Sequence, residues 1–273
     1  MDNSPLETRW WARYNPFLKG LLALVAILLV AVWWINTPPG LLGKAAAAGY
    51  AVCHQITSHS FLIGDHQMPL CARCTGMYLG ALLGVIYLTR FGKRGGMPPV
   101  KIGVVLGLFM LFFAVDGVNS YLHFFPGAPE LYQPENWLRL LTGTGVGLGI
   151  AAVLVPVTNQ VFWLDGDPRP ALEGWRQFLP LLGLAALLDL VVLSEASLLL
   201  YPLALLSAAA IFVVLSLVYA MVWTMLFKRE NHFKRYRDLW LPLLAGFIVA
   251  MLQIGGFDIF RFWLTGTWAG FSL

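Results

Sequence analysis

Residues 202–227 read PLALLSAAAIFVVLSLVYAMVWTMLF, an apolar run without a single charged side chain. An α-helix rises about 1.5 Å per residue, so about 20 apolar residues are enough to cross the hydrocarbon core of a bilayer. In lipid, a helix satisfies all of its own backbone hydrogen bonds. This stretch therefore predicts a transmembrane helix, and the rest of the fold depends on how many similar runs surround it.

The composition of the whole chain agrees with a membrane protein. Of its 273 residues, 59% are hydrophobic and only 12% are charged, whereas soluble domains carry about 25% charged residues. This excludes a water-soluble enzyme and a disordered chain. The net charge of +4 comes from short basic runs between apolar segments, so we read it as topology information and expect no nucleic-acid partner.

Six further apolar runs lie elsewhere in the chain. Together with residues 202–227 they predict an all-α fold: a polytopic membrane helix bundle of about seven transmembrane helices. We expect residues 1–16 to form a cytoplasmic N-terminal segment and residues 17–273 to form a single transmembrane domain. The run nearest the N-terminus, residues 17–35, resembles a signal peptide. It is long enough to span the membrane and no small-residue cleavage site follows it, so we expect it to be uncleaved. The predicted spans are 17–35, 71–89, 100–115, 137–157, 178–193, 202–227 and 239–257.

The basic residues predict how the bundle is oriented. Lys and Arg concentrate in cytoplasmic loops, and here they lie before the first span, between the second and third, and between the sixth and seventh. We therefore expect a multi-pass protein of the cytoplasmic (inner) membrane, with its N-terminus inside and its C-terminus outside. The bilayer is its expected partner, together with a possible membrane-protein partner. The basic residues are Arg9, Arg13, Lys19, Arg90, Lys93, Arg94, Lys101, Lys228, Arg229, Lys234, Arg235 and Arg237.

Rows of glycines four residues apart lie on three of the spans. Such rows let helix backbones approach closely in lipid, so we expect the second, third and fourth spans to pack tightly together. The rows are Gly76/Gly80/Gly84, Gly103/Gly107, Gly143/Gly147 and Gly145/Gly149.

The chain has three cysteines, all early in the sequence. Cys71 and Cys74 are three residues apart in the first turn of a predicted helix, where the helix dipole and free N–H groups favour thiolates, and Arg73 adds a positive charge. With Cys53 they provide three thiolates, and His54 is the first candidate for a fourth ligand. The sequence therefore predicts a zinc or iron site formed by Cys53, His54, Cys71 and Cys74. His59 and His66 compete for the fourth place.

Two other interpretations of the cysteines stay open. They could belong to a membrane thiol–disulfide oxidoreductase, linked to a quinone. Alternatively they perform no chemistry, and the chain is a non-enzymatic subunit or scaffold of a larger membrane complex. Whether the protein is an enzyme is left open too, since a closed Cys₃His site would be structural while catalytic zinc keeps a position for water or substrate.

Several polar residues lie near the predicted outer ends of the spans, where each is costly unless it is paired or wetted. We expect Asp116, Asn136 and Arg139 to line a polar pocket beside the cysteines, with Arg139 turned away from lipid towards Asp116 or an anionic ligand. Asp258 and Arg261 are expected to form an ion pair. Asp189 lies deeper and is expected to pair with a neighbouring helix or to relay a proton; its role, like that of Glu195, is not assigned.

The cysteine region also resembles a known family. The strings Cys53-His-Gln, Ser60-Phe, Gly64 and Pro69-Leu-Cys-Ala-Arg-Cys-Thr-Gly-Met-Tyr-Leu-Gly80, followed by Asp116-Gly and Asn136-Trp-Leu-Arg-Leu-Leu-Thr-Gly143, resemble the prokaryotic membrane protein family domain of unknown function 2085. The resemblance covers residues 45–155 and leaves 178–273 as additional helices. His59 stands where the family pattern has arginine. The resemblance implies a multi-pass membrane protein and no particular reaction.

Overall fold

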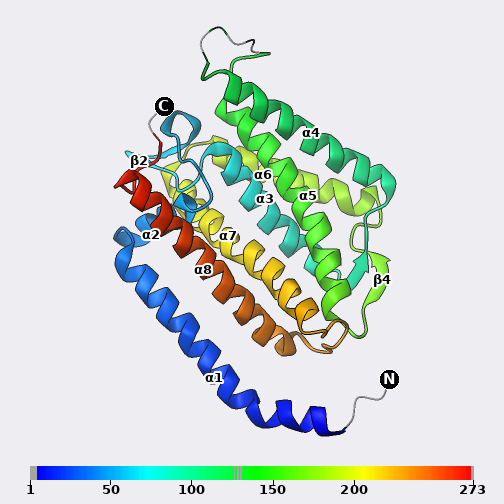
Figure 1. The fold of residues 1–273 in the computed structure, drawn as a ribbon. Coiled ribbons are helices and arrows are strands. Elements are labelled where there is room, and N and C mark those ends of the chain that lie inside the picture. Colours follow the sequence, from blue (N-terminus) through cyan, green and yellow to red (C-terminus); the bar gives the residue numbers. More distant parts are fainter. Residues whose placement is uncertain (1–4, 126, 128, 130, 272–273) are drawn as a thin grey trace.

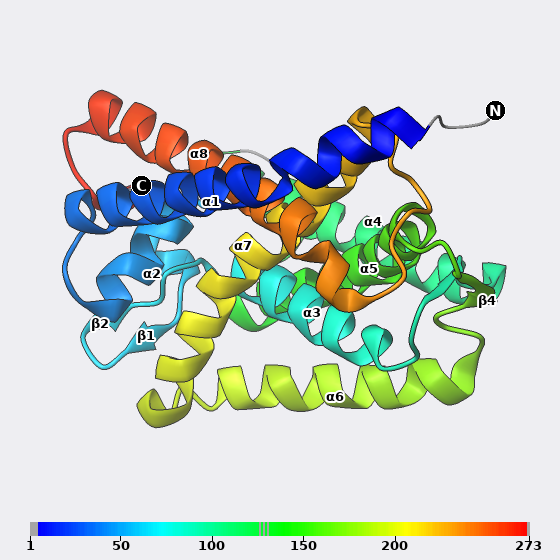
Figure 2. The same cartoon turned by 90° about the horizontal axis from the view of Figure 1, so that it is seen from below.

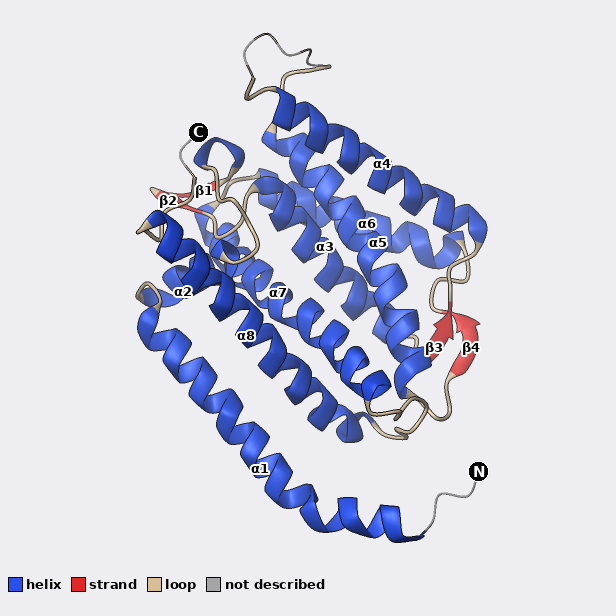
Figure 3. Cartoon of the chain, in the orientation of Figure 1, coloured by secondary structure: helices blue, strands red, loops and turns tan. Residues whose placement is uncertain are grey.

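The computed structural model describes residues 5–271 except 126, 128 and 130, and for residues 5–15 it describes the backbone alone. Within this part of the chain, seven helices are long and apolar enough to cross a membrane, and they form one bundle (Figures 1 and 3). The all-α class and the number of spans are therefore confirmed.

The seven long helices follow the predicted runs closely, with shorter elements between them. α1 is already helical from Pro5, although its apolar span begins at Pro16, and α4 and α5 extend beyond their predicted runs. The long helices are α1 Pro5–Asn36, α3 Ala72–Thr89, α4 Val100–Leu122, α5 Asn136–Phe162, α6 Trp175–Leu193, α7 Ser197–Leu226 and α8 Trp240–Thr265. The short elements are α2 Gly40–Tyr50, η1 Thr57–His59, β1 Leu62–Ile63, β2 His66–Gln67, β3 Arg94–Gly96, β4 Asp167–Pro170 and η2 Tyr236–Leu239.

Helices α3 and α5 form the close-packed centre of the bundle. A methyl group on Gly76 would lie 2.8 Å from Thr144 N, and one on Gly147 would lie 2.6 Å from Ala81 N. Gly80 and Gly143 face the opposing backbone as closely. These glycines are required because the two backbones touch, which confirms the prediction for these two rows.

The glycine row on α4 behaves differently. Nothing lies within 4 Å of a methyl group built on Gly103 or Gly107, so the prediction that this row packs is wrong. Instead α4 rests on α5 through Phe109, whose Cβ lies 2.9 Å from a methyl group built on Gly145. A small-residue row permits close approach but does not choose the neighbour, and α4 presents a different face to α5.

The remaining helices surround this pair. Figure 2 shows α1 beside α8 at one edge of the bundle and α6 at the opposite edge, with α7 crossing between them. One end of the bundle gathers α2, the β1–β2 hairpin, the start of α3 and the end of α8, while β3, β4 and the α7–α8 connection lie at the other end (Figure 1). The first of these ends carries the cysteines.

Candidate metal centre

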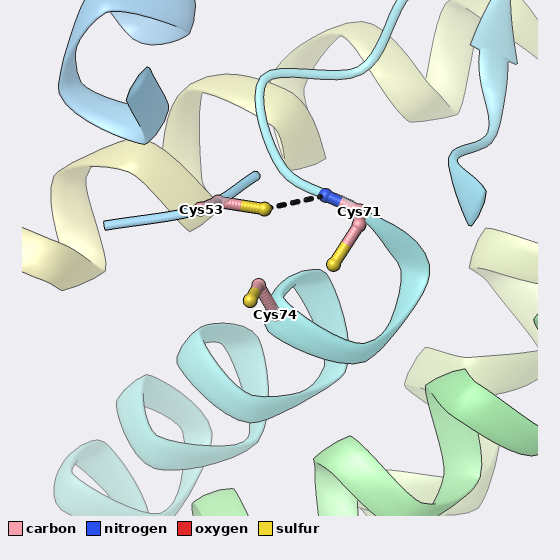
Figure 4. A group of neighbouring side chains, drawn as sticks. All are labelled: Cys53, Cys71 and Cys74. Carbon is pink, nitrogen blue, oxygen red and sulfur yellow. Dashed lines mark hydrogen bonds between the residues drawn. The ribbon is translucent and has the colours of Figure 1, made fainter. Parts of the chain in front are cut away.

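The three cysteines converge at the start of α3. Cys53 follows α2, Cys71 caps the N-terminus of α3 and Cys74 lies in its first turn. Their sulfur atoms all lie within 4.8 Å of one another, and Figure 4 shows the three side chains grouped at the start of α3. Four sulfurs at the usual Zn–S distance of about 2.3 Å would be roughly 3.8 Å apart in a tetrahedron. Only small side-chain movements therefore separate this arrangement from metal-binding geometry.

The sulfur of Cys53 accepts hydrogen bonds from two backbone N–H groups. Cys71 N donates to it over 3.3 Å, the dashed line in Figure 4, and Gln55 N over 3.4 Å. Gln55 reaches this position with a left-handed φ of 54°, which is uncommon for a residue other than glycine. Together the two contacts hold the Cys53 sulfur in place beside the start of α3.

The side chain of Gln55 holds this turn in place. Its amide donates to Ala46 O over 2.8 Å and to Pro69 O over 2.7 Å, which ties the end of α2 to the segment before α3. The amide of Gln67 in β2 donates in turn to Gln55 O over 2.8 Å. The sequence showed Gln55 only as part of the Cys-His-Gln string and did not indicate this structural role.

Arg261 of α8 fixes the other side of the same turn. Its Nη1 donates to Tyr50 O over 2.7 Å and to Cys53 O over 2.5 Å, and its Nη2 donates to His54 O over 3.1 Å. The predicted ion pair between Asp258 and Arg261 is wrong, because Asp258 instead accepts from Trp33 Nε1 over 2.8 Å. The carbonyls of the Cys53 turn offer Arg261 three acceptors in the geometry that its planar guanidinium prefers.

The sulfurs lie in a largely apolar environment. Cys53 is only 5% exposed and packs in a buried cluster to which α2, α3, α7 and α8 all contribute. Hydrogen bonding with Cys53 and Cys74 holds the pKa of the Cys71 thiol well below its usual range, and the positive charge of Arg73 acts in the same direction. One of the three sulfurs is thus favoured as a thiolate even before a cation binds.

No histidine or carboxylate from the described residues joins the three sulfurs. The ring of His54 packs on Phe271, with centroids 5.8 Å apart, and the ring of His59 stacks on Phe124 at 5.4 Å. His66 is an exposed residue of β2. Burial lowers the pKa of His59 to about 4, and Arg139 contributes. Three of the four predicted ligands are brought together, and His54 as the fourth stays a prediction.

Arg73 connects the cysteine helix to α4. It forms a salt bridge with the carboxylate of Asp116, which is 1% exposed, and it donates to Ser120 Oγ over 3.0 Å. Tyr132 donates its hydroxyl to Asp116 Oδ1 over 3.0 Å. Burial, together with this bond, raises the pKa of Tyr132 to about 12. The polar groups around Asp116 are therefore mutually satisfied.

The predicted pairing of Asp116 with Arg139 is wrong, since among the described residues the salt bridge of Asp116 is with Arg73. Arg139 donates instead to Asn136 Oδ1, one helical turn away, over 2.8 Å. Arg139 is only 4% exposed, which confirms that it turns away from lipid. Arg73 takes the carboxylate because it projects from α3 directly towards α4.

The two unassigned acids lie outside this centre. Asp189 of α6 accepts a hydrogen bond from Thr144 of α5 over 2.7 Å, so it meets a neighbouring helix as expected. Glu195 is exposed in the turn between α6 and α7, with a left-handed φ of 50°.

Comparison with known proteins covers the same region. A family model described as "Predicted membrane protein (DUF2085)" matches residues 53–153. An uncharacterised protein of Methanocaldococcus jannaschii is 33% identical over 113 residues, which cover 41% of this chain and 67% of that protein. An uncharacterised protein of Methanothermobacter thermautotrophicus is 28% identical over 102 residues, covering 37% of this chain and 83% of that protein. No solved structure matches the chain. The family match contains all three cysteines, whereas α7 and α8 lie beyond it.

Proposed function

We propose that this chain, which belongs to the DUF2085 family of predicted membrane proteins, binds one thiophilic metal ion through Cys53, Cys71 and Cys74. The observation that carries the proposal is the convergence of all three sulfurs to within 4.8 Å of one another. Soft thiolate ligands select zinc, copper(I) or iron over hard cations such as magnesium. Zinc is the first candidate and iron the second.

The charges around the cysteines support this assignment. Three thiolates and one divalent cation carry a net charge of −1, which is costly in an apolar environment unless it is compensated. Arg73 lies between two of the cysteines in sequence and Arg261 donates to the carbonyl of Cys53. Asp116 already neutralises the charge of Arg73. The charge of Arg261 then offsets the net charge of −1 on the metal site, so the region is close to neutral.

The three-sulfur set leaves one coordination position to another ligand. A closed Cys₃His site would be structural, whereas three protein ligands with a fourth position for water or substrate are typical of catalytic zinc. The ring of His54 packs on Phe271 rather than joining the sulfurs. This favours a site whose fourth ligand exchanges with solvent, a substrate or a partner protein.

Thiol–disulfide exchange is the second candidate. Cys71 and Cys74 form a Cys-x-x-Cys pair at a helix N-terminus, and the lowered pKa of Cys71 suits a nucleophilic thiol. Oxidation of this pair would form one S–S bond and pass two electrons and two protons to a membrane quinone. The convergence of Cys53 on the same point favours the metal, because a two-cysteine redox pair does not require a third sulfur.

The deciding experiment is elemental analysis of the full chain purified in detergent without chelators. We expect about one equivalent of zinc or iron, lost in Cys71→Ser and Cys74→Ser. Thr75→Ser is the matched control, since it lies in the same helical turn and keeps the hydroxyl that donates to Leu70 O. Cobalt(II) bound to the wild type should show the intense visible bands of tetrahedral thiolate coordination, a readout independent of variant folding. Absence of metal together with a reversible Cys71–Cys74 disulfide would establish the redox function instead.

We further propose that the cysteine end faces away from the cytoplasm, in the cytoplasmic membrane. The distribution of basic residues supports this orientation. An alkaline phosphatase reporter fused after Gly64 should be active and one fused after Gly95 inactive. The opposite pattern would place the cysteines inside the cell.

A further inference from the structure

A second polar region lies at the end of the bundle opposite the cysteines. A cavity of about 970 Å³ opens between α1, the end of α7, the start of α8 and the segment that connects α7 to α8. Its volume is at the upper end of the range of about 300–1,000 Å³ found for small-molecule sites. None of its lining residues belongs to the candidate metal centre.

The charged residues that line this cavity are mostly cations. Lys19 of α1 lines it, as do Lys234, Arg235 and Arg237 from the segment before α8, and the acidic lining residue is Asp238. Asp238 accepts a hydrogen bond from the backbone N–H of Arg235 over 3.0 Å. Within the described part of the chain, no salt bridge joins any of these four cations to a carboxylate. The side chains that line the cavity therefore carry an excess of positive charge.

Apolar side chains line the rest of the same cavity. Leu22 of α1, Trp223 of α7 and Leu241 of α8 line it, together with Trp240, which stands at the first position of α8. Tryptophans at helix ends typically lie at the level of the lipid headgroups. The cavity thus combines cationic and apolar side chains at one end of the bundle.

We propose that this cavity binds an anionic phospholipid, with its phosphate among Lys19, Lys234 and Arg237 and its upper acyl chains against Leu22 and Leu241. Charge complementarity chooses the headgroup, because basic pockets between membrane helices bind phosphate-bearing lipids. The apolar lining residues favour a lipid over a free phosphate compound, because a free phosphate compound would leave these side chains in contact with water. A neutral lipid would leave the cations unpaired.

The competing explanation is that these cations only orient the chain, as basic residues in cytoplasmic loops generally do. The two explanations predict different effects on lipid binding for cations inside the cavity and cations outside it. If orientation is the whole role, the loss of two cations from the cavity and of two elsewhere on the same face should affect lipid binding equally. If the cavity is a lipid-binding site, only the loss of the two cavity cations should weaken lipid binding.

The test measures retention of phosphatidylglycerol and of phosphatidylcholine by the purified full chain, using native mass spectrometry and lipid titration. The wild type should retain phosphatidylglycerol preferentially, and Lys234→Gln combined with Arg237→Gln should bind it about 30-fold more weakly, since each cation near a membrane surface contributes roughly a fivefold factor. The matched control is Arg90→Gln with Lys101→Gln. It removes the same charge from exposed residues outside the cavity and should change binding less than twofold.

Three results would overturn the proposal. Equal retention of the two lipids would show no headgroup selection. Equal losses in the cavity variant and the control would support an orienting role alone. Displacement of the bound lipid by millimolar inorganic phosphate would identify a soluble phosphate compound as the ligand. A salt titration of the wild type provides a measurement that does not depend on variant folding, since phosphatidylglycerol affinity should fall as salt screens the cations.

Discussion

Gly147 of α5 offers the sharpest test of the bundle's centre. Its Cα faces the backbone of α3, where an added methyl group would lie 2.6 Å from Ala81 N, 2.9 Å from Gly80 C and closer still to Met77 O. These atoms belong to backbone and cannot rotate away. Gly147→Ala should therefore force the two helices apart, although alanine is the better helix former.

The magnitude follows from these distances. Non-bonded heavy atoms prefer about 3.5–4.0 Å, so the helices must separate by roughly 1 Å over one turn. Overpacking of this kind costs about 1–3 kcal/mol, and the rigid backbone partners favour the upper part of that range. Helix propensity returns up to about 1 kcal/mol. We expect a net destabilisation of about 2 kcal/mol, or a fall in melting temperature of about 4–8 °C.

The assay is thermal unfolding of the purified protein in detergent. Gly149→Ala is the matched control, because it lies on the same helix two residues away and nothing lies within 4 Å of its added methyl group. That variant should melt at or above the wild-type temperature. A Gly147→Ala protein as stable as Gly149→Ala would refute the close approach of α3 and α5.

Three further outcomes are expected. Arg261→Gln should weaken metal binding about 10–100-fold in a chelator competition, because loss of a group that orients a metal ligand has an effect of this size. Arg261→Lys should recover part of the lost affinity. Unchanged affinity in Arg261→Gln would show that α8 does not hold the Cys53 turn. Asp116→Asn should lower the free energy of unfolding by about 2 kcal/mol, as measured in thermal melts. This is less than for a fully buried ion pair, because the Arg73 side chain is 21% exposed. Adding Arg73→Gln should restore part of the lost stability. The folded-state pKa of His59, about 4, lies below the ordinary histidine value of about 6.5, so the unfolded state binds the proton first. Stability should therefore fall as the pH drops from about 6.5 towards 4. His59→Gln should flatten this slope in melts across that range, and an equally steep slope would assign it to other groups.

Much of the architecture was predictable because it depends on local properties of the chain. The length and apolarity of residues 202–227 are enough to make them a spanning helix in any arrangement of neighbours. The spacing of Cys71 and Cys74 likewise places both sulfurs on one helical face whatever packs against it. Helix α2 was missed, because its short alanine-rich run is too brief to span and resembles a connecting segment.

The partners of the polar residues could not be predicted in the same way. Asp116 had two arginines within reach by sequence, and its choice of Arg73 over Arg139 depends on the rotation of α3 relative to α4. Arg261 was assigned to its near neighbour Asp258 but holds the Cys53 turn, more than 200 residues away in the chain. Sequence spacing describes only contacts within one helix, whereas these contacts form between helices.

The glycine rows show the same division between local and tertiary information. The sequence alone established that α3, α4 and α5 each carry small residues one turn apart, and that three cysteines lie near the start of one helix. Only the tertiary structure decided that α3 and α5 use their rows while the α4 row faces open space. It also decided that α7 and α8 enclose the cysteines. The physical reason is that a helix forms from hydrogen bonds and apolar surface along its own length, whereas its neighbours depend on how all the helices fit together at once.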